Sequence, residues 1–293
     1  MGKLIKKIRD KIKFYLFLIE LIFKFFRQAR FYKPYINSVI KYIDKSKISE
    51  AMMSEMTTIG KGVTLGAIAL SFLRGYKINE NERKVAMLVG AIEALYDGFF
   101  DDFSKDPERI KALVYNIENS DDPYEQLLIT LSKELRRLKP IDQNPEFHKT
   151  IDLIYNAQVR SLKQKDLSTT IEELINISKE KCGYTVILMR YCLENPLVAG
   201  ERDAAYSFGA LMQLYDDKQD VLVDSRRGIR TFATEIKDSE EIGRIIKQAE
   251  EEAVDKLRKM DYPMKNIEKF LLVIPILGKI TNLDNSASFK NNK

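Results

Sequence analysis

The sequence predicts an all-α fold, and three observations support this. Only 13 Gly and 8 Pro occur among 293 residues, whereas a β-sandwich or barrel needs a turn signal about every ten residues. The long segments between these turn formers carry apolar residues at spacings of three and four, the pattern of an amphipathic helix. With 45% hydrophobic and 31% charged residues, the composition matches that of a globular protein and argues against disorder. We therefore expect a single helical domain.

Residues 1–33 are expected to form a basic amphipathic helix. They hold ten Lys and Arg against Asp10 and Glu20, a net charge of +8, and the rest of the chain carries −3 because the total is +5. Apolar residues recur along this segment at helical spacing: Ile5, Ile8, Ile12, Tyr15, Ile19, Ile22 and Phe26. The longest uncharged run, 14–19, is far shorter than the roughly 20 apolar residues that span a bilayer. The helix is thus expected either to pack on the core or to lie on a membrane surface without crossing it.

Ten further helices are expected after Pro34, separated by short breaks in which Gly, Pro, Asn and Asp cluster. Their ranges are 35–46, 49–74, 80–103, 106–118, 122–138, 145–163, 168–193, 200–225, 238–260 and 263–281. No break is long enough for an interdomain linker, so we expect 34–281 to form one domain. Residues 63–72 and 85–95 are apolar nearly all round the helix, which predicts that they lie at the centre of a bundle. The polar residues 282–293 predict a frayed tail.

Several classes of site and partner are disfavoured. Cys182 and Cys192 cannot form a disulfide framework, and with His148 they provide no zinc-ligand cluster. The basic residues fall on one apolar-rich helix rather than among stacking aromatic residues, so no nucleic-acid partner is expected. A reducing, cytoplasmic location is expected, with 1–33 as the segment for peripheral contact at the inner membrane surface.

Three carboxylates, Asp97, Asp101 and Asp102, lie at the end of an expected helix that is otherwise apolar. On a helix, Asp97 and Asp101 stand one turn apart, with Asp102 adjacent. Stacked like charges repel, and a divalent cation removes that repulsion. Mg²⁺ commonly binds one or two carboxylates while it keeps water molecules and phosphate oxygens as further ligands, so this cluster predicts a magnesium site.

A second acidic cluster repeats this pattern. Asp216, Asp220 and Asp224 form an i, i+4, i+8 column, with Asp217 beside it. Cations that could neutralise a polyanion lie before and after the column: Lys181, Arg227 and Arg230. Carboxylates, a metal ion and cations together point to a diphosphate. One such column is typical of a solvated helix end, but two that each close a long apolar helix are more specific.

The acidic runs resemble those of class I isoprenoid synthases. The run FGALMQLYDDKQD at 208–220, preceded about thirty residues earlier by Lys181-Cys182, looks like the second aspartate-rich region and the Lys-Thr dyad of trans-prenyl diphosphate synthases. Extended to Gly228, it is also similar to the second motif of squalene and phytoene synthases, and 97–102 follows the D-x-x-x-D-D spacing of their first motif. The resemblance covers roughly 85–232. It implies an all-α bundle around a central cavity, in which the two motifs face one another and bind Mg²⁺ and the substrate diphosphate.

The chain departs from the pattern of each subfamily. The segment 60–64 lacks the Arg and Pro of the Gly-Lys-x-x-Arg-Pro segment in chain-elongating synthases, and their arginine pair after the first motif is absent here. The acids of 216–220 stand where microbial terpene cyclases have an Asn-Ser-Glu-type motif, and Gln219 stands where squalene and phytoene synthases usually have arginine. Ordinary chain elongation is therefore disfavoured, and the subfamily stays open.

The resemblance implies ionisation of an allylic prenyl diphosphate and assigns roles to the residues above. The expected catalytic residues are Asp97, Asp101, Asp216 and Asp220. The expected metal ligands are these four with Asp102, Asp217 and Asp224, and the expected diphosphate-binding residues are Lys181, Arg227 and Arg230. Residues near the motifs are expected to line a dry cavity that stabilises a carbocation, although each could equally serve core packing: Gly90, Ala94, Phe99, Phe100, Phe208, Met212, Gln213 and Tyr215. Asp97 and Asp216 are expected to face this cavity together.

The leading prediction is a Mg²⁺-dependent terpene synthase, a carbon–oxygen lyase. It would ionise a long-chain prenyl diphosphate through a metal–diphosphate cluster and then cyclise or deprotonate the carbocation. Two alternatives stay open: a head-to-head prenyl transferase of the squalene or phytoene synthase type, and a non-catalytic helical bundle that binds prenyl lipids. Chain length, product skeleton and oligomeric state also stay open, with a homodimer as one candidate.

Overall fold

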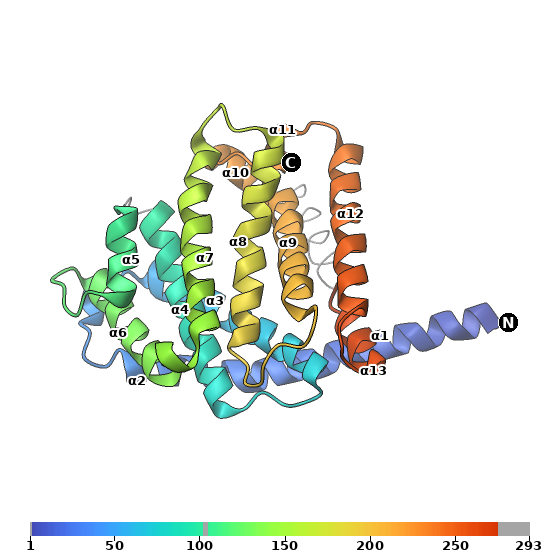
Figure 1. Cartoon of the computed structure of the whole chain (residues 1–293), viewed down its shortest axis with the longest axis horizontal. Coiled ribbons are helices and arrows are strands. Elements are labelled where there is room, and N and C mark those ends of the chain that lie inside the picture. The colour runs from blue at the N-terminus through green and yellow to red at the C-terminus, as the bar shows by residue number, and fades with distance from the viewer. Residues whose placement is uncertain (1, 102–104, 275–293) are drawn as a thin grey trace, which may run out of the picture. The chain divides into compact units, whose positions relative to one another are not determined.

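The computed structural model describes residues 2–101 and 105–274, and these form α-helices and short 3₁₀ turns without any strand (Figure 1). The predicted all-α fold is confirmed. The helices are α1 (Gly2–Ala29), α2 (Tyr32–Val39), α3 (Glu50–Arg74), α4 (Glu80–Asp101), α5 (Pro107–Tyr115), α6 (Pro123–Leu138), α7 (Pro145–Ser161), α8 (Ile171–Tyr191), α9 (Glu201–Gln219), α10 (Val221–Arg227), α11 (Phe232–Glu235), α12 (Ser239–Arg258) and α13 (Met264–Leu271). The predicted tail at 282–293 lies outside the described residues.

The chain divides into two compact units. Unit 1 comprises the residues up to Gln143, which include α1 to α6, together with Glu268–Leu272. Unit 2 comprises Asn144–Ile267, which includes α7 to α12, and the chain after Leu272. The sequence had given no sign of this division because the connection at the boundary, from α6 to α7, is short and itself contains a 3₁₀ turn, Ile141–Gln143.

Two helices form the centre of unit 1, as predicted for 63–72 and 85–95. In α3 and α4 the residues of these stretches are almost all buried. The two helices approach closely, since a Cβ atom on Gly90 would lie 2.5 Å from the Cα atom of Gly60. Within the described part of the chain, α3 is also the one helix that is long and apolar enough to cross a membrane, but 61% of its apolar window is buried inside the protein. Burial in the core accounts for that composition.

An ion-pair cluster on α6 anchors the chain that follows α4. The Glu125 carboxylate accepts hydrogen bonds from Lys105 Nζ at 3.0 Å, Arg109 Nη2 at 2.6 Å and Ser120 Oγ at 2.7 Å. Lys105 also pairs with Asp122 at 2.8 Å. Burial acts to raise the pKa of Glu125, but these hydrogen bonds outweigh it and lower the pKa to about 2. The first described residue after the acidic end of α4 is therefore fixed to the first turn of α6.

Unit 2 is a layer of long helices in which α7, α8, α9 and α12 lie side by side (Figure 1). At one end of the α8–α9 pair, Arg190 and Glu201 are 0% and 1% exposed and form an ion pair at 2.5 Å. The Arg190 guanidinium also donates to the carbonyl of Pro196 at 3.1 Å, and the Tyr262 hydroxyl donates to Glu201 at 3.0 Å. Such a pair is tolerated in the interior only when hydrogen bonds satisfy both charged groups, and here they do.

Several boundaries differ from the prediction. The helix expected at 35–46 ends at Val39, and the helix expected at 263–281 ends at Leu271. The break expected at Pro34 is wrong, because α1 ends at Ala29 and α2 begins at Tyr32. Pro34 lies in the first turn of α2, where its missing N–H breaks no helical hydrogen bond. Tyr32 is buried and its hydroxyl donates to the Met56 carbonyl at 2.5 Å, so tertiary contact starts this helix early. The helix expected at 200–225 is divided, as described below.

Candidate active site

The second acidic cluster lies where α9 passes into α10. Asp220 caps α9 with φ −92° and ψ 11°, so the predicted continuous helix is interrupted there. The backbone nevertheless keeps its i to i−4 hydrogen bonds, because Asp220 N–H donates to the Asp216 carbonyl at 2.9 Å and Asp224 N–H donates to the Asp220 carbonyl at 2.8 Å. The three acidic residues therefore stay one turn apart through the junction. The turn after them closes at Gly228, which has a left-handed φ of 68°.

Mutual repulsion is visible in the pKa values of these carboxyl groups. Burial and then the nearby Asp220 charge raise the pKa of Asp216, against smaller opposing effects of Gln213 and Lys181. The side chain of Asp216 is still accessible to solvent. The desolvation of its carboxylate therefore comes from the protein atoms around it. Burial, followed by the charges of Asp220 and Asp216, raises the pKa of Asp224 to about 6. The cluster therefore holds more negative charge than its surroundings compensate.

Asp217 occupies a different environment from the rest of the column. It is 4% exposed, and its carboxylate accepts hydrogen bonds from Ser178 Oγ at 2.6 Å and Gln213 Nε2 at 2.9 Å. Burial raises its pKa to about 6. Since Ser178 belongs to α8, the structure places this predicted metal ligand in the contact between α8 and α9. Sequence reasoning did not single out Ser178, and no motif in the sequence points to it.

Gln213 connects the buried and the accessible acidic groups. Its Nε2 atom lies 2.9 Å from Asp217 Oδ1 and 3.2 Å from Asp216 Oδ2. It had been predicted to line a cavity, whereas the structure shows it as a hydrogen-bond donor to both carboxylates. Gln213 thereby links the position of the Asp216 side chain to the α8–α9 contact.

The three predicted diphosphate-binding cations have unequal roles. Lys181 lies close enough to lower the pKa of both Asp216 and Asp224, and Arg227 lowers that of Asp224. Arg230 instead pairs with Glu235 at 2.8 Å and donates to the backbone carbonyl of Asp166 at 2.5 Å. It thus fastens the segment after α10 to the residue that follows the 3₁₀ turn Leu162–Lys165. Lys181 and Arg227 are the cations placed beside the acidic column.

The first acidic cluster lies at the end of α4 in unit 1. Asp97 is partly buried, one turn before Asp101, the last residue of the helix. The side chain of Asp101 and all of Asp102 lie outside the described structure. Phe99 is fully buried, and Lys105 Nζ lies 5.3 Å from the centre of its ring.

The remaining predicted cavity residues serve packing in several cases. Ala94, Phe100 and Phe208 are buried, and Met212 is partly exposed. Gly90 faces the backbone of α3, which favours the packing alternative for this residue. The Tyr215 hydroxyl lies 3.2 Å from Glu250 Oε2 on α12, and burial raises its pKa to about 12.

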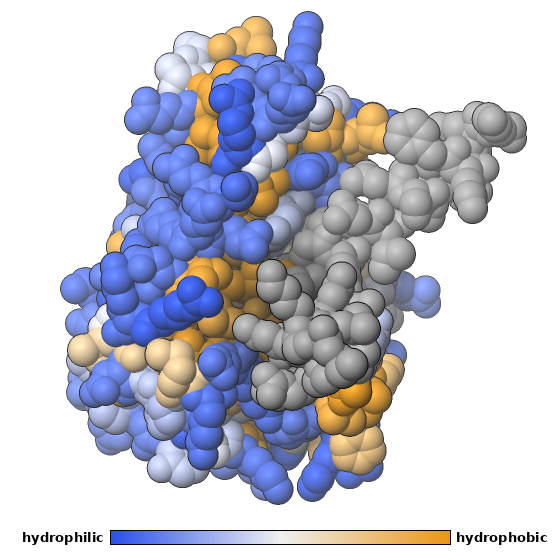
Figure 2. Space-filling model, turned by 90° about the vertical axis from the view of Figure 1, so that its right-hand side faces the viewer, coloured by the Kyte–Doolittle hydropathy of each residue, from blue (hydrophilic) through white to orange (hydrophobic). Residues whose placement is uncertain are grey.

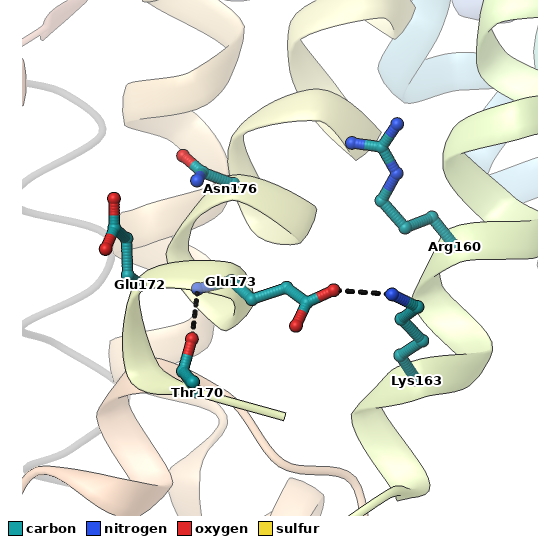
Figure 3. A pocket seen from close by; sticks show the side chains of 6 residues that line it. All are labelled: Arg160, Lys163, Thr170, Glu172, Glu173 and Asn176. Atoms are coloured by element: carbon teal, nitrogen blue, oxygen red, sulfur yellow. Dashed lines mark hydrogen bonds and ion pairs between the residues drawn. The ribbon is translucent and has the colours of Figure 1, made fainter. Parts of the chain in front are cut away.

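A separate pocket of about 410 Å³ opens between α7 and α8, and none of the predicted site residues lines it (Figure 3). Charged and polar side chains line it: Arg160, Lys163, Thr170, Glu172, Glu173 and Asn176. Lys163 pairs with Glu173 at 2.6 Å, and Arg160 pairs with Glu180 at 2.7 Å. Its cations are thus already neutralised by neighbouring carboxylates.

The acidic column fits Mg²⁺ only as part of a larger ligand set. Among the residues whose placement is described, no three His, Cys, Asp or Glu side chains are arranged to hold a metal ion by themselves. Mg²⁺, however, is commonly bound by one or two carboxylates, with water and substrate phosphate oxygens completing an octahedron. The oxygen donors of Asp216, Asp220 and Asp224, whose repulsion a cation would relieve, match that mode.

Comparison with solved structures identifies the fold. No family model matches the chain, and no curated protein sequence matches it. The structure of a geranyltransferase from Legionella pneumophila is similar at a TM-score of 0.52 with 14% identity, covering 92% of this chain and 98% of that one. A geranylgeranyl pyrophosphate synthetase from the archaeon Geoglobus acetivorans is similar at a TM-score of 0.59 with 11% identity, covering 88% and 98%. The fold predicted from the acidic motifs is therefore confirmed.

Proposed function

We propose that this protein is a Mg²⁺-dependent enzyme that ionises a prenyl diphosphate. The observation that carries the proposal is the acidic column at the α9–α10 junction, where Asp216 and Asp224 have raised pKa values and Lys181 and Arg227 lie beside them. Uncompensated carboxylates next to cations suit a ligand that brings both metal ions and phosphate groups. The fold shared with two prenyl diphosphate enzymes supports the same substrate class.

The residues of the column would hold the substrate diphosphate through Mg²⁺ bound by Asp216, Asp220 and Asp224. The metal supplies Lewis-acid stabilisation of the charge that collects on the departing diphosphate. Lys181 and Arg227 would donate hydrogen bonds to the same leaving group and stabilise its charge further. Gln213 orients Asp216, and Asp217, which is buried against Ser178, holds Gln213 in place. Asp97 and Asp101 of the first cluster would act in the same ionisation.

The finer assignment that we favour is a terpene synthase of lyase type, because the chain lacks the Gly-Lys-x-x-Arg-Pro segment and the arginine pair of chain-elongating synthases. The second candidate is a prenyl transferase, which is favoured by the names of the two similar structures. A head-to-head transferase of the squalene or phytoene type would join two identical prenyl chains. A bundle that only binds prenyl lipids is the third candidate.

Product analysis separates these candidates. The purified protein is incubated with prenyl diphosphates from geranyl to geranylfarnesyl chain length and Mg²⁺, and diphosphate release is measured. A product with an unchanged carbon count indicates a lyase, and a doubled count indicates head-to-head transfer. Addition of EDTA is expected to abolish release. Failure to release diphosphate from any of these substrates, despite their binding, would contradict both the lyase and the head-to-head transferase.

A matched pair of variants links the reaction to the column. Asp216→Asn removes a charge from the acidic column, whereas Asp203→Asn makes the same change at an exposed position in the first turn of the same helix. We expect Asp216→Asn to lower turnover by about 10²- to 10³-fold, the usual effect of removing one group that stabilises a transition state. Asp203→Asn should keep wild-type turnover. Equal activity of both variants would contradict the proposed role of the column.

A further inference from the structure

Helix α1 has two apolar faces, and the protein uses one of them for its own packing. Phe17 and Leu21 are 4% and 6% exposed. The ring of Phe17 lies edge-on to that of Phe72 on α3 at 5.3 Å. Glu20 pairs with Lys269 at 2.7 Å, which fastens the same side of the helix to α13. The core-packing alternative expected for residues 1–33 thus accounts for part of this helix.

The second apolar face is exposed. Its seven residues are between 44% and 69% exposed: Ile12, Tyr15, Leu16, Ile19, Ile22, Phe23 and Phe26. At about 100° per residue they occupy an arc of about 120°, and the middle of this arc is opposite to Phe17 and Leu21. We call these seven residues the exposed face of α1. Figure 2 shows one face of the molecule, on which a group of hydrophobic side chains lies at the lower edge.

This face differs from the other exposed apolar residues of the described chain. Tyr42, Tyr76 and Leu167, for example, are isolated side chains on loops, and single exposed hydrophobic residues are normal. A continuous stripe of Ile, Leu and Phe along several helical turns is not. Contiguous patches of this kind mark a surface that binds a protein or a membrane.

Charge decides between these two occupants. Arg27 is exposed at one edge of the arc. The first 33 residues together carry +8. A second copy of this chain would bring two such segments into contact, and the repulsion would oppose association. An anionic bilayer offers the complementary charge at its surface and an apolar layer just beneath it.

We propose that the exposed face of α1 binds the surface of anionic lipid bilayers, with its apolar side chains inserted between the headgroups and Arg27 beside the lipid phosphates, which also attract the net positive charge of residues 1–33. The opposite face of α1 stays packed on α3, so the whole protein is held at the bilayer. Binding of this kind is peripheral and weakens as salt screens the charges. The proposal stands apart from the chemistry proposed for the acidic column.

Co-sedimentation of the full-length chain with vesicles tests it. One set contains phosphatidylcholine and phosphatidylserine in equal parts, and the other contains phosphatidylcholine alone. We expect the wild-type protein to sediment with the anionic vesicles, to bind the neutral vesicles about tenfold more weakly, and to be released by high salt. Equal binding to both sets, or no binding to either, would overturn the proposal.

Two variants of equal severity assign the binding to this face. Ile19→Ser/Phe23→Ser removes two members of the exposed face, and we expect it to weaken binding to anionic vesicles about tenfold or more. Tyr42→Ser/Leu167→Ser removes two exposed apolar side chains elsewhere and should bind as the wild type does. Both are expected to keep the helical circular dichroism, since all four side chains are exposed. If the first variant binds as well as the second, the face is not the membrane contact.

Light scattering tests whether a second copy of the chain, rather than a membrane, covers the exposed face of α1. The wild type and Ile19→Ser/Phe23→Ser are compared for molar mass in the absence of lipid. A wild-type dimer that this variant converts to a monomer would assign the face to a second copy and refute membrane binding. Diphosphate release from a water-soluble short-chain substrate should be unchanged in the variant, so that failure here leaves the proposed function untouched.

Discussion

Replacement of Glu125 by Gln should destabilise the protein in a way that depends on pH. Glu125 has an ordinary pKa of 4.5, and in the folded chain the hydrogen bonds from Arg109, Ser120 and Lys105 outweigh burial and lower it to about 2. A pKa change of one corresponds to about 1.4 kcal/mol. The ionised carboxylate therefore contributes about 3 kcal/mol to the free energy of unfolding at pH 7.

The sign and the pH window follow from the direction of this shift. Because the folded pKa lies below the unfolded one, the contribution is fully present above about pH 4.5 and is lost as the pH falls toward 2. At pH 3 the same relation leaves about 1.4 kcal/mol. The wild type should therefore be more stable than Glu125→Gln by about 3 kcal/mol at pH 7, and this difference should shrink by about half at pH 3.

Urea unfolding followed by far-ultraviolet circular dichroism at pH 7 and pH 3 measures the difference. Glu118→Gln is the control, because Glu118 is exposed in the same unit, and surface substitutions of this kind usually change stability by less than about 0.5 kcal/mol. A stability loss in Glu125→Gln that is the same at both pH values would refute the reasoning. It would mean that shape, rather than the charge of the carboxylate, decides the stability of the cluster.

Two further predictions follow from close contacts, and a third concerns the first acidic cluster. Gly90→Ala places a Cβ atom 2.5 Å from Gly60 Cα. This variant should lower the free energy of unfolding by about 1–3 kcal/mol, which is measured as a lower melting temperature. Gly62→Ala is the control, because its Cβ atom would meet nothing within 4 Å, and it should be neutral or stabilising. Arg190→Met leaves Glu201 buried without its cation and should cost about 3–5 kcal/mol in urea unfolding; the double variant with Glu201→Gln should recover part of that loss. Asp97→Asn should lower diphosphate release without lowering the helical circular dichroism, and full activity would remove the first acidic cluster from the mechanism.

The sequence allowed the helices and the fold to be predicted, but not the partners of individual side chains. Apolar periodicity and turn formers depend on local sequence, and so the ranges of most long helices agree with the prediction to within a few residues. The division at Asp220 and the start of α2 at Tyr32 depend on tertiary contacts that periodicity does not contain. Asp217 resembles its neighbours in the motif, yet its burial against Ser178 depends on how α8 packs on α9.

The candidate site residues show the same limit. The prediction grouped Lys181, Arg227 and Arg230 by charge alone, and only the structure separates the first two, beside the acidic column, from Arg230, which is paired with Glu235. Gly90 shows a related limit. In a sequence, a small residue is equally consistent with free space beside the helix and with close packing of two helices. Which of these applies is decided by the neighbouring helix, and that neighbour is α3.

The α8–α9 pair is joined by two polar contacts that are well separated along the helices. Arg190 pairs with Glu201 at one end of the pair, and Ser178, about three helical turns away along α8, donates to Asp217 near the end of α9. Two fixed contacts between a pair of helices set both their relative translation and their relative rotation. Lys181 and Asp216 are therefore aligned when the chain folds rather than when a ligand binds. The electrostatic environment for a departing anion would then be preorganised, and little of the binding energy would be needed to assemble it.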